Sequence, residues 1–252
     1  MRWTYGDVCG IHADELRKST RSVPQPEVGV HFQPIADLWT GKVFAQEALC
    51  RCTRPGFERP DYLFAAAVAE QATGHLGRLV REAALPFGES RRVFINLHPA
   101  ELSSRWLVRP DDPIYLYSGP LYLEITEAAA LEYFDLCKGV LAEVCSRTGA
   151  VVVVDDFGAG YSNLTRIIEL KPGVVKLDRT LVRELDKNAR QRILVANLNR
   201  LCQDLGADVV AEGIETQDEL QAVIDCGVRY GQGYLLGRPS NPPPEVTWRP
   251  QA

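Results

Sequence analysis

The chain alternates between short apolar runs and longer stretches with helical spacing. The short runs, rich in Val, Ile and Leu, cover residues 28–35, 43–48, 93–97, 121–126, 151–155, 174–177, 209–211 and 230–236. Between most of them, apolar positions recur with a helical period at residues 62–85, 131–147, 190–205 and 217–226, and shorter helices fit residues 99–106 and 162–170. The pattern predicts an α/β fold.

Most of these strand-like runs are continuously apolar, which is typical of parallel strands buried on both faces. About eight such strands with intervening helices, over roughly 220 residues, predict a TIM-type (β/α)8 barrel. Only residues 36–42 separate the first two runs. That is a hairpin spacing, so one strand is expected to run antiparallel. A doubly wound open sheet is the alternative.

The ends of the chain lack the periodic pattern of the middle. Residues 1–27 show no clear period and close on Pro24 and Pro26, which break regular structure. We therefore expect an N-terminal extension over residues 1–27, one barrel domain over residues 28–242, and a C-terminal tail over residues 243–252.

Composition and charge exclude several classes of protein. With 28 basic and 33 acidic residues the formal charge is −5, so no broad basic surface for long nucleic acids is expected. No apolar run reaches the roughly 18 residues of a membrane span, and the N-terminus is too polar for a signal peptide. The seven cysteines are scattered, with Cys50 and Cys52 as the one close pair. They indicate free thiols in a reducing compartment, hence a cytoplasmic protein.

Polar residues recur at or just past the carboxyl ends of the predicted strands. They are Glu47, Asn96, Glu124, Asp155, Asp156, Lys176, Glu212 and Gln232. In a parallel barrel these strand ends share one face, the face on which active sites are built. A single strand-end acid is more often a helix cap or half of a surface ion pair. A whole series at matching positions instead predicts a site.

So many carboxylates at close quarters would repel one another and take up protons unless a cation neutralises them. A set of carboxylates with an asparagine carbonyl suits Mg²⁺ or Mn²⁺ better than zinc. The adjacent Asp155 and Asp156 suit two ions about 3.5–4 Å apart, the spacing used for in-line attack on phosphorus.

A glycine-rich turn, residues 156–162, follows the most apolar strand. It contains Gly158 and Gly160 but lacks the further residues of a dinucleotide-binding or P-loop motif. It fits a plain βα turn in which Ser162 caps the next helix, and equally a mobile loop beside the metals.

At these residues the sequence resembles the EAL-domain family, phosphodiesterases specific for cyclic di-GMP. The family's signature stands as Glu47-Ala48-Leu49-Cys50-Arg51, and six more blocks follow in order between Asn96 and Pro239. Their sequences are Asn96-Leu97-His98-Pro99, Glu124-Ile125-Thr126-Glu127, the turn from Asp155 to Ser162, Lys176-Leu177-Asp178, Val210 to Thr216 and Gln232 to Pro239. The resemblance covers about residues 28–240 and implies a (β/α)8 barrel with one antiparallel strand.

The resemblance also implies roles for these residues. Glu47, Asn96, Glu124 and Asp155 would hold a first Mg²⁺ or Mn²⁺ ion. Asp155 would bridge to a second, with Asp156 and Glu212 nearby, and Ca²⁺ is expected to inhibit. Lys176 would position the attacking water, and Glu212 would act as general base or share that task with the metals. The product would be linear 5′-pGpG.

Further residues are assigned to the substrate and to the loops around the site. Gln33, Leu49, Arg51, Asp178 and Gln232 would contact or approach the substrate. Glu127 and Glu215 would steady the glycine turn, including Gly158 and Gly160, and the metal region. Where the family often has serine after the asparagine motif this chain has His98, which is expected to be a packing residue. A homodimer is expected by resemblance alone.

Three functions remain open at this point. An active cyclic di-GMP phosphodiesterase is favoured, because none of the metal or base residues is missing. A degenerate domain that binds cyclic di-GMP as a receptor, or acts through a protein partner, would usually lack some of them. A metal-dependent hydrolase of another phosphodiester would rest on the same residues.

Overall fold

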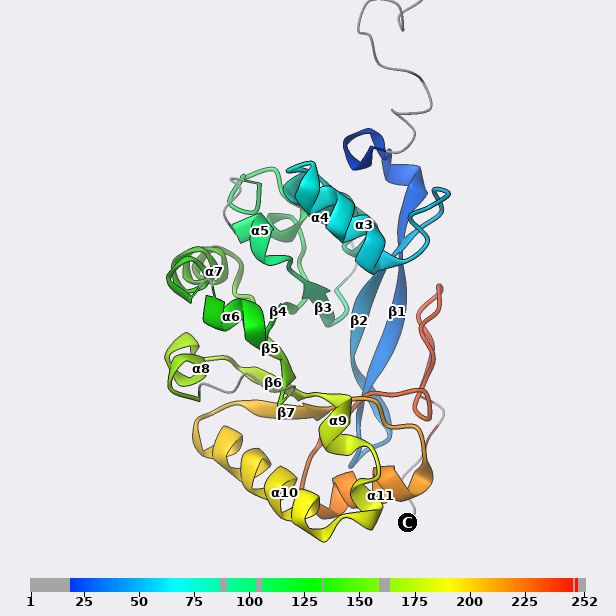
Figure 1. The fold of residues 1–252 in the computed structure, drawn as a ribbon, viewed down its shortest axis with the longest axis vertical. Coiled ribbons are helices and arrows are strands. Elements are labelled where there is room, and N and C mark those ends of the chain that lie inside the picture. Colours follow the sequence, from blue (N-terminus) through cyan, green and yellow to red (C-terminus); the bar gives the residue numbers. More distant parts are fainter. Residues whose placement is uncertain are drawn as a thin grey trace, which may run out of the picture.

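The computed structural model describes residues 19–86, 90–102, 106–132, 134–158, 164–246 and 248. Eight strands form one closed barrel in chain order (Figure 1). They are β1 (Val28–Asp37), β2 (Lys42–Cys52), β3 (Val93–Asn96), β4 (Leu121–Thr126), β5 (Val151–Phe157), β6 (Val174–Leu177), β7 (Asp208–Ala211) and β8 (Tyr230–Gly231). β1 pairs antiparallel with both β2 and β8, whereas the other neighbours are parallel. The predicted barrel with one antiparallel strand is confirmed.

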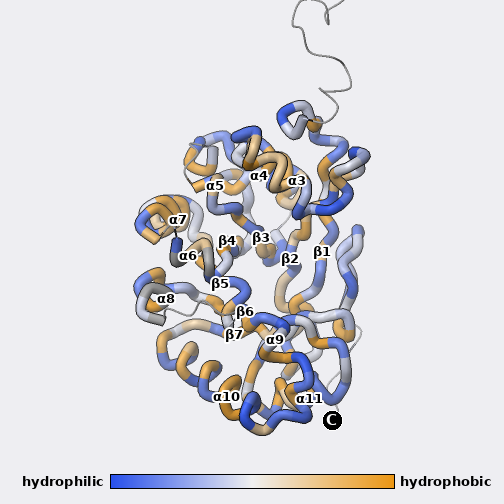
Figure 2. Tube along the Cα trace, in the orientation of Figure 1, coloured by the Kyte–Doolittle hydropathy of each residue, from blue (hydrophilic) through white to orange (hydrophobic). Residues whose placement is uncertain are grey.

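Helices surround the barrel and connect its strands. They are α3 (Pro60–Ala69), α4 (Thr73–Ala84), α5 (Pro99–Leu102), α6 (Glu127–Glu132), α7 (Phe134–Thr148), α8 (Leu164–Leu170), α9 (Arg179–Val182), α10 (Ala189–Asp204) and α11 (Gln217–Asp225). Short 3-10 turns are η1 (Thr20–Ser22), η2 (Gln25–Glu27), η3 (Pro113–Tyr115) and η4 (Leu185–Lys187). Figure 2 shows hydrophobic positions recurring along the longer helices, as expected for helices with one buried side. None of the described helices combines the length and the apolar character needed to cross a bilayer.

Several predicted elements differ in extent from the structure. The strand expected over residues 43–48 spans Lys42–Cys52, and the range 131–147 includes the end of α6 and most of α7. The helix expected over residues 62–85 is divided into α3 and α4, because Gln71 adopts a left-handed backbone conformation with φ of 54°. The strand expected over residues 230–236 ends at Gly231. Beyond it the chain turns with Gly233 packed on the backbone of Ile214, where a Cβ would overlap main-chain atoms.

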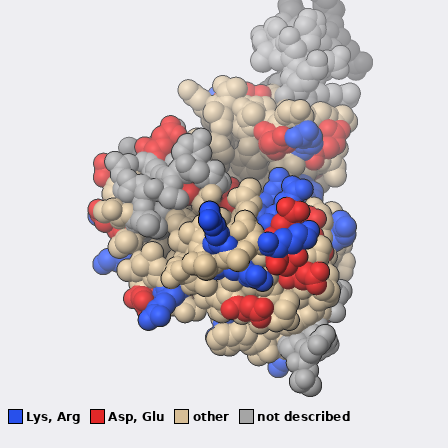
Figure 3. All heavy atoms as spheres, turned by 60° about the horizontal axis from the view of Figure 1, so that its bottom comes forward, with Lys and Arg blue, Asp and Glu red and all other residues tan. Residues whose placement is uncertain are grey.

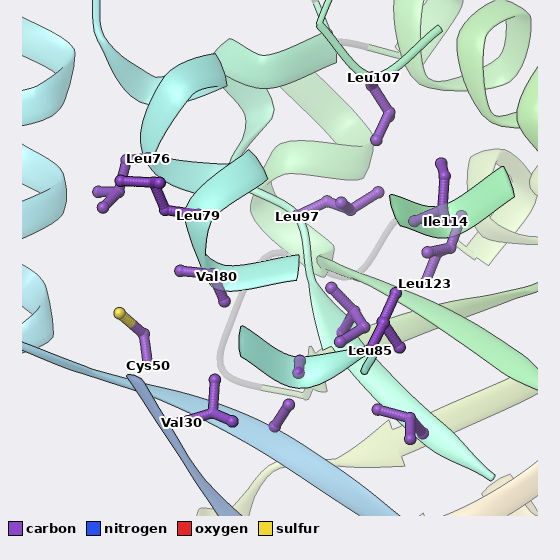
Figure 4. Packing of buried hydrophobic residues seen from close by; sticks show 14 of the residues in the cluster. Val30, Cys50, Leu76, Leu79, Val80, Leu85, Leu97, Leu107, Ile114 and Leu123 are labelled. Atoms are coloured by element: carbon purple, nitrogen blue, oxygen red, sulfur yellow. The ribbon is translucent and has the colours of Figure 1, made fainter. Parts of the chain in front are cut away.

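The largest core cluster fills the space between the sheet and the helices beside β1–β4. Leu76, Leu79 and Val80 of α4 face Val30 of β1 and Cys50 of β2 (Figure 4). Cys50 is a free thiol, as are the other five described cysteines, and burial raises its pKa to about 12. Cys9 lies outside the described residues.

A second apolar layer fills the lower part of the barrel interior. Its aromatic members stack, with ring centroids 4.3 Å apart for Phe94 and Tyr122 and 4.2 Å apart for Phe44 and Tyr230. The layer closes the barrel beneath the strand ends, so the polar residues above it are reached from one side.

Replacing a ring of this layer tests its contribution to stability. Phe94→Ala removes a fully buried ring and should lower the free energy of unfolding by about 3–5 kcal/mol, measured by urea denaturation. Ile193→Ala on α10, where the side chain is 63% exposed, is the control and should change it by less than about 0.5 kcal/mol. If Phe94→Ala lowers the free energy of unfolding by less than about 1 kcal/mol, the second apolar layer is not tightly packed.

Candidate active site

The site lies directly above the apolar layer because side chains two residues apart on a strand share one face. Seven strands, β2 to β8, place a site residue within them or just past their ends, two positions after a residue of that layer. The pairs are Ala45 and Glu47, Phe94 and Asn96, Tyr122 and Glu124, Val153 and Asp155, Val174 and Lys176, Val210 and Glu212, and Tyr230 and Gln232. The predicted strand-end residues are therefore brought together at the mouth of the barrel.

Lys176 lies at the centre of this group. Its ammonium nitrogen is 2.7 Å from Glu212 Oε1, 2.9 Å from Glu124 Oε1, 3.2 Å from Asp155 Oδ1 and 3.4 Å from Glu47 Oε2. The lysine side chain is 1% exposed. One buried positive charge thus faces four carboxylates, and the group carries an excess of negative charge.

A β-bulge explains how two consecutive aspartates reach the same site. Val154 pairs with Val175 and Phe157 pairs with Leu177, so Asp155 and Asp156 together oppose the single residue Lys176. Asp156 has φ of 56°, a conformation that non-glycine residues adopt mainly where the surroundings impose it. Such a bulge redirects side chains, and carboxylate oxygens of Asp155, Asp156 and Glu212 lie within 4.8 Å of one another.

Amide side chains hold the carboxylate of Glu47 in place. Asn96 Nδ2 donates to Glu47 Oε1 at 2.9 Å, and Gln232 Nε2 donates to Glu47 Oε2 at 2.6 Å. Gln232 Nε2 also donates to Oε1 of Gln33, whose own Nε2 donates to the carbonyl of Gly237. Through Gln33, β1 contributes to the site although it runs opposite to the other strands.

Burial and like charge shift the titration of these acids. Burial, together with Glu47, raises the pKa of Glu124 well above its ordinary value. Burial raises the pKa of Glu212 to about 8, although Lys176 acts in the opposite direction. The pKa of Glu47 is lowered despite burial, because Lys176 and the amides of Gln232 and Asn96 stabilise its charge. Burial also opposes the charge of Lys176, but the carboxylates around it raise its pKa well above the usual range.

The donor atoms fit a hard divalent cation. Glu124 Oε2 is buried and receives no hydrogen bond from any described residue, while Glu124 Oε1 and Asp155 Oδ1 share the ammonium group of Lys176 with two other acids. Buried carboxylate oxygens are costly without partners, and the surrounding ligand atoms are oxygens, which Mg²⁺ and Mn²⁺ prefer. The residues present therefore suit the predicted metals.

A pocket of about 300 Å³ opens beside the acids. It is lined by Gln33, Glu47, Asp156, Asp178, Arg179, Glu212, Gly213, Glu215, Gln232, Gly233 and Tyr234. Of these, Arg179, Gly213, Gly233 and Tyr234 were not singled out in the sequence, although each directly follows or lies within one of the motifs. A larger cavity of about 470 Å³ between α8 and α10 has a mostly apolar lining and contains none of the strand-end acids.

Other predicted residues take different places. Leu49 and Arg51 do not line this pocket, and the Arg51 guanidinium donates to the Cys50 carbonyl at 2.8 Å. Asp178 lines the pocket and also caps α9 by accepting from the Thr180 N–H. Glu127 is buried and accepts from the Gly158 N–H at 3.1 Å, so it is linked to the glycine turn as predicted. Gly160 lies outside the described residues.

Comparison with known proteins identifies the family. The family model described as EAL domain matches residues 14–239. The chain belongs to the EAL domain family. The boundaries expected for the extension, the domain and the tail stay a prediction.

Relatives with recorded functions and structures are similar to this EAL domain over most of its length. The cyclic di-GMP phosphodiesterase RocR of Pseudomonas aeruginosa is 28% identical over 87% of the chain and 59% of RocR. A manganese and cyclic di-GMP complex of Klebsiella pneumoniae BlrP1 is 30% identical with a TM-score of 0.71, covering 87% of this chain and 58% of that one. An EAL domain protein from Listeria monocytogenes is 26% identical with a TM-score of 0.74, covering 91% and 94%. The chain spans 27–59% of the length of the curated relatives it matches.

The raised pKa of Glu212 makes the stability of the metal-free EAL domain depend on pH. The pKa is about 8 when folded and about 4.3 when unfolded. Protonated Glu212 therefore stabilises the folded state fully below the unfolded pKa, and this stabilisation is lost as the pH rises through 8. In EDTA, the melting temperature should be lower at pH 9 than at pH 6. Glu212→Gln should flatten this dependence, and parallel pH profiles of the two proteins would contradict the shift.

Proposed function

We propose that this EAL domain hydrolyses cyclic di-GMP to linear 5′-pGpG in a reaction that requires Mg²⁺ or Mn²⁺. The observation that carries the proposal is the group of four carboxylates that share the single ammonium group of Lys176, with Glu124 Oε2 buried and without a hydrogen bond from any described residue. RocR, a relative by sequence, is named a cyclic di-GMP phosphodiesterase, and the BlrP1 complex contains that nucleotide.

In this proposal Glu47, Asn96, Glu124 and Asp155 hold one divalent cation, and Asp155, Asp156 and Glu212 hold the second. Bound divalent cations would lower the pKa of a coordinated water and stabilise charge on the phosphoryl oxygens. Both ions would also neutralise the excess of negative charge that Lys176 alone leaves unbalanced.

The protein's own groups then orient the reactants. Lys176 would donate to the attacking water and keep it among the acids, while Glu212, ionised once cations balance the charge of the group, would accept the proton of that water. Gln232 and Asn96 hold Glu47 in one orientation. Gln33, Asp178, Gln232 and the neighbouring Arg179 line the pocket where the nucleotide would lie.

Assembly and location are part of the same proposal. We expect a homodimer, as the resemblance implies, and action in the cytoplasm. On the face that Figure 3 shows, acidic and basic side chains are interspersed, which agrees with a small-molecule substrate rather than a long nucleic acid.

A time course of cyclic di-GMP resolved by chromatography tests the activity. Linear 5′-pGpG should form with Mg²⁺ or Mn²⁺ and not with EDTA. Glu212→Gln should lower kcat by about 10²–10⁴, more than it weakens substrate binding, because it removes the proton acceptor and a carboxylate ligand of the second ion. Glu143→Gln on α7, an exposed acid far from the strand ends, is the control and should be unchanged. Binding without turnover in the parent protein would favour the receptor function, and turnover of other phosphodiesters alone would favour a different substrate.

Calcium provides a second test of the metal requirement. Ca²⁺ accepts longer and less regular coordination than Mg²⁺, so it should bind the acids but spread the spacing of the two ions. We expect Ca²⁺ to support little hydrolysis and to inhibit competitively with Mg²⁺ in initial-rate measurements. Full activity in Ca²⁺ alone would contradict the two-ion arrangement.

A further inference from the structure

A second buried ion cluster links α4 to the turn that follows β3. Arg81 of α4 donates through Nη1 to Glu101 Oε2 at 2.6 Å and through Nη2 and Nε to the carboxylate of Asp112. All three side chains are at most 1% exposed. None of them was singled out by the sequence, and none takes part in the proposed chemistry.

Glu101 is the third residue of α5, and it caps the start of that helix and closes the turn after Asn96. Its Oε1 accepts from the His98 N–H at 3.1 Å, and its own N–H donates to the His98 carbonyl at 2.8 Å. His98 Nδ1 accepts from the Ala100 N–H at 3.2 Å, and Pro99 is the first residue of α5. This is a reciprocal capping arrangement with histidine as the cap, so His98 has a structural task here.

The position of the Glu101 carboxylate is tightly defined. It packs against Gly77 of α4, and a Cβ at that position would overlap both carboxylate oxygens. Arg81, one turn further along α4, donates to the same carboxylate. The turn after β3 is therefore tied to α4 by one side chain with a single available orientation.

The position of the Asn96 side chain depends on this turn, because the side chain is exposed at the barrel mouth. Its Nδ2 donates to Glu47, and its Oδ1 makes no hydrogen bond to any other described residue. The main chain continues through Leu97, whose N–H donates to the Glu124 carbonyl, into the capped turn. The backbone on the far side of Asn96 is thus held by Glu101.

We propose that Glu101, held by Arg81 against Gly77, is a positioning residue that aims Asn96 Oδ1 at the divalent cation. The inference rests on the proposed metal-dependent function. A buried ion cluster is weak evidence for stability, since apolar residues of similar volume often serve equally well. The geometry of the turn is a more direct reason for an acid at this position.

The two acids that share Arg81 offer matched variants. Glu101→Gln and Asp112→Asn both replace a carboxylate by an amide and leave Arg81 with one acid. The amide of Glu101→Gln can accept from Arg81 or from the His98 N–H but not from both. Asp112 instead accepts from Arg81 and the Ile114 N–H, away from Asn96.

Mn²⁺ affinity measured by titration calorimetry without nucleotide separates the two roles, with melting temperatures recorded in parallel. We expect Glu101→Gln to weaken Mn²⁺ binding about tenfold, within the range seen when groups supporting metal ligands are changed. Asp112→Asn should lower the melting temperature comparably and leave Mn²⁺ affinity within about twofold of the parent.

Equal Mn²⁺ affinities in both variants would overturn the inference and leave the proposed function standing. A parent protein that binds no Mn²⁺ would overturn the metal site itself, and with it this inference. If Glu101→Gln does not fold, Gly77→Ala is measured instead, because it displaces the carboxylate and keeps every charge. Mn²⁺ affinity unchanged in a folded Gly77→Ala protein would equally overturn the inference.

Discussion

A single buried ammonium group surrounded by four carboxylates is the interaction on which the site depends. Lys176 brings the acids from four strands within 3.4 Å of one nitrogen, yet it can neutralise the charge of only one of them. The remaining acids must take up protons or cations, because an unpaired buried carboxylate is strongly destabilising. Their raised pKa values and their capacity to hold divalent ions thus have the same physical origin.

Continuously apolar runs, with polar residues at or just past their carboxyl ends, made both the barrel and most of the site predictable. Glu124 lies two positions after Tyr122, a residue of the second apolar layer. The parallel strands of the barrel repeat this relation around the site. The sequence therefore locates the acids without any knowledge of distances. It could not reveal the bulge that turns Asp155 and Asp156 to the same side, because the bulge is a property of the β5–β6 register.

Features that depend on contacts between distant segments were also beyond the sequence. The break at Gln71 interrupts a continuous helical pattern, and the last strand ends early where Gly233 packs on Ile214. Arg179 and Tyr234 line the pocket through the placement of their turns, not through any periodic pattern. Hydrophobic spacing predicts which face of a helix or strand packs against the core, but it carries no information on the contacts between two loops.

The two buried ion clusters differ in how far water and ions can reach them. Around Arg81 the three charged side chains are at most 1% exposed, so ions from solution do not reach the negative charge that Arg81 leaves in excess, and burial raises the pKa of Glu101. Around Lys176 the side chains of Asp155 and Glu212 remain 12% and 19% exposed. An acid group that is short of positive charge and open on one side can accept cations from solution, whereas a closed one can only fix geometry. The two clusters therefore suit different tasks, because the closed one holds the turn after Asn96 and the open one has the exposure and the excess of negative charge that suit cation binding.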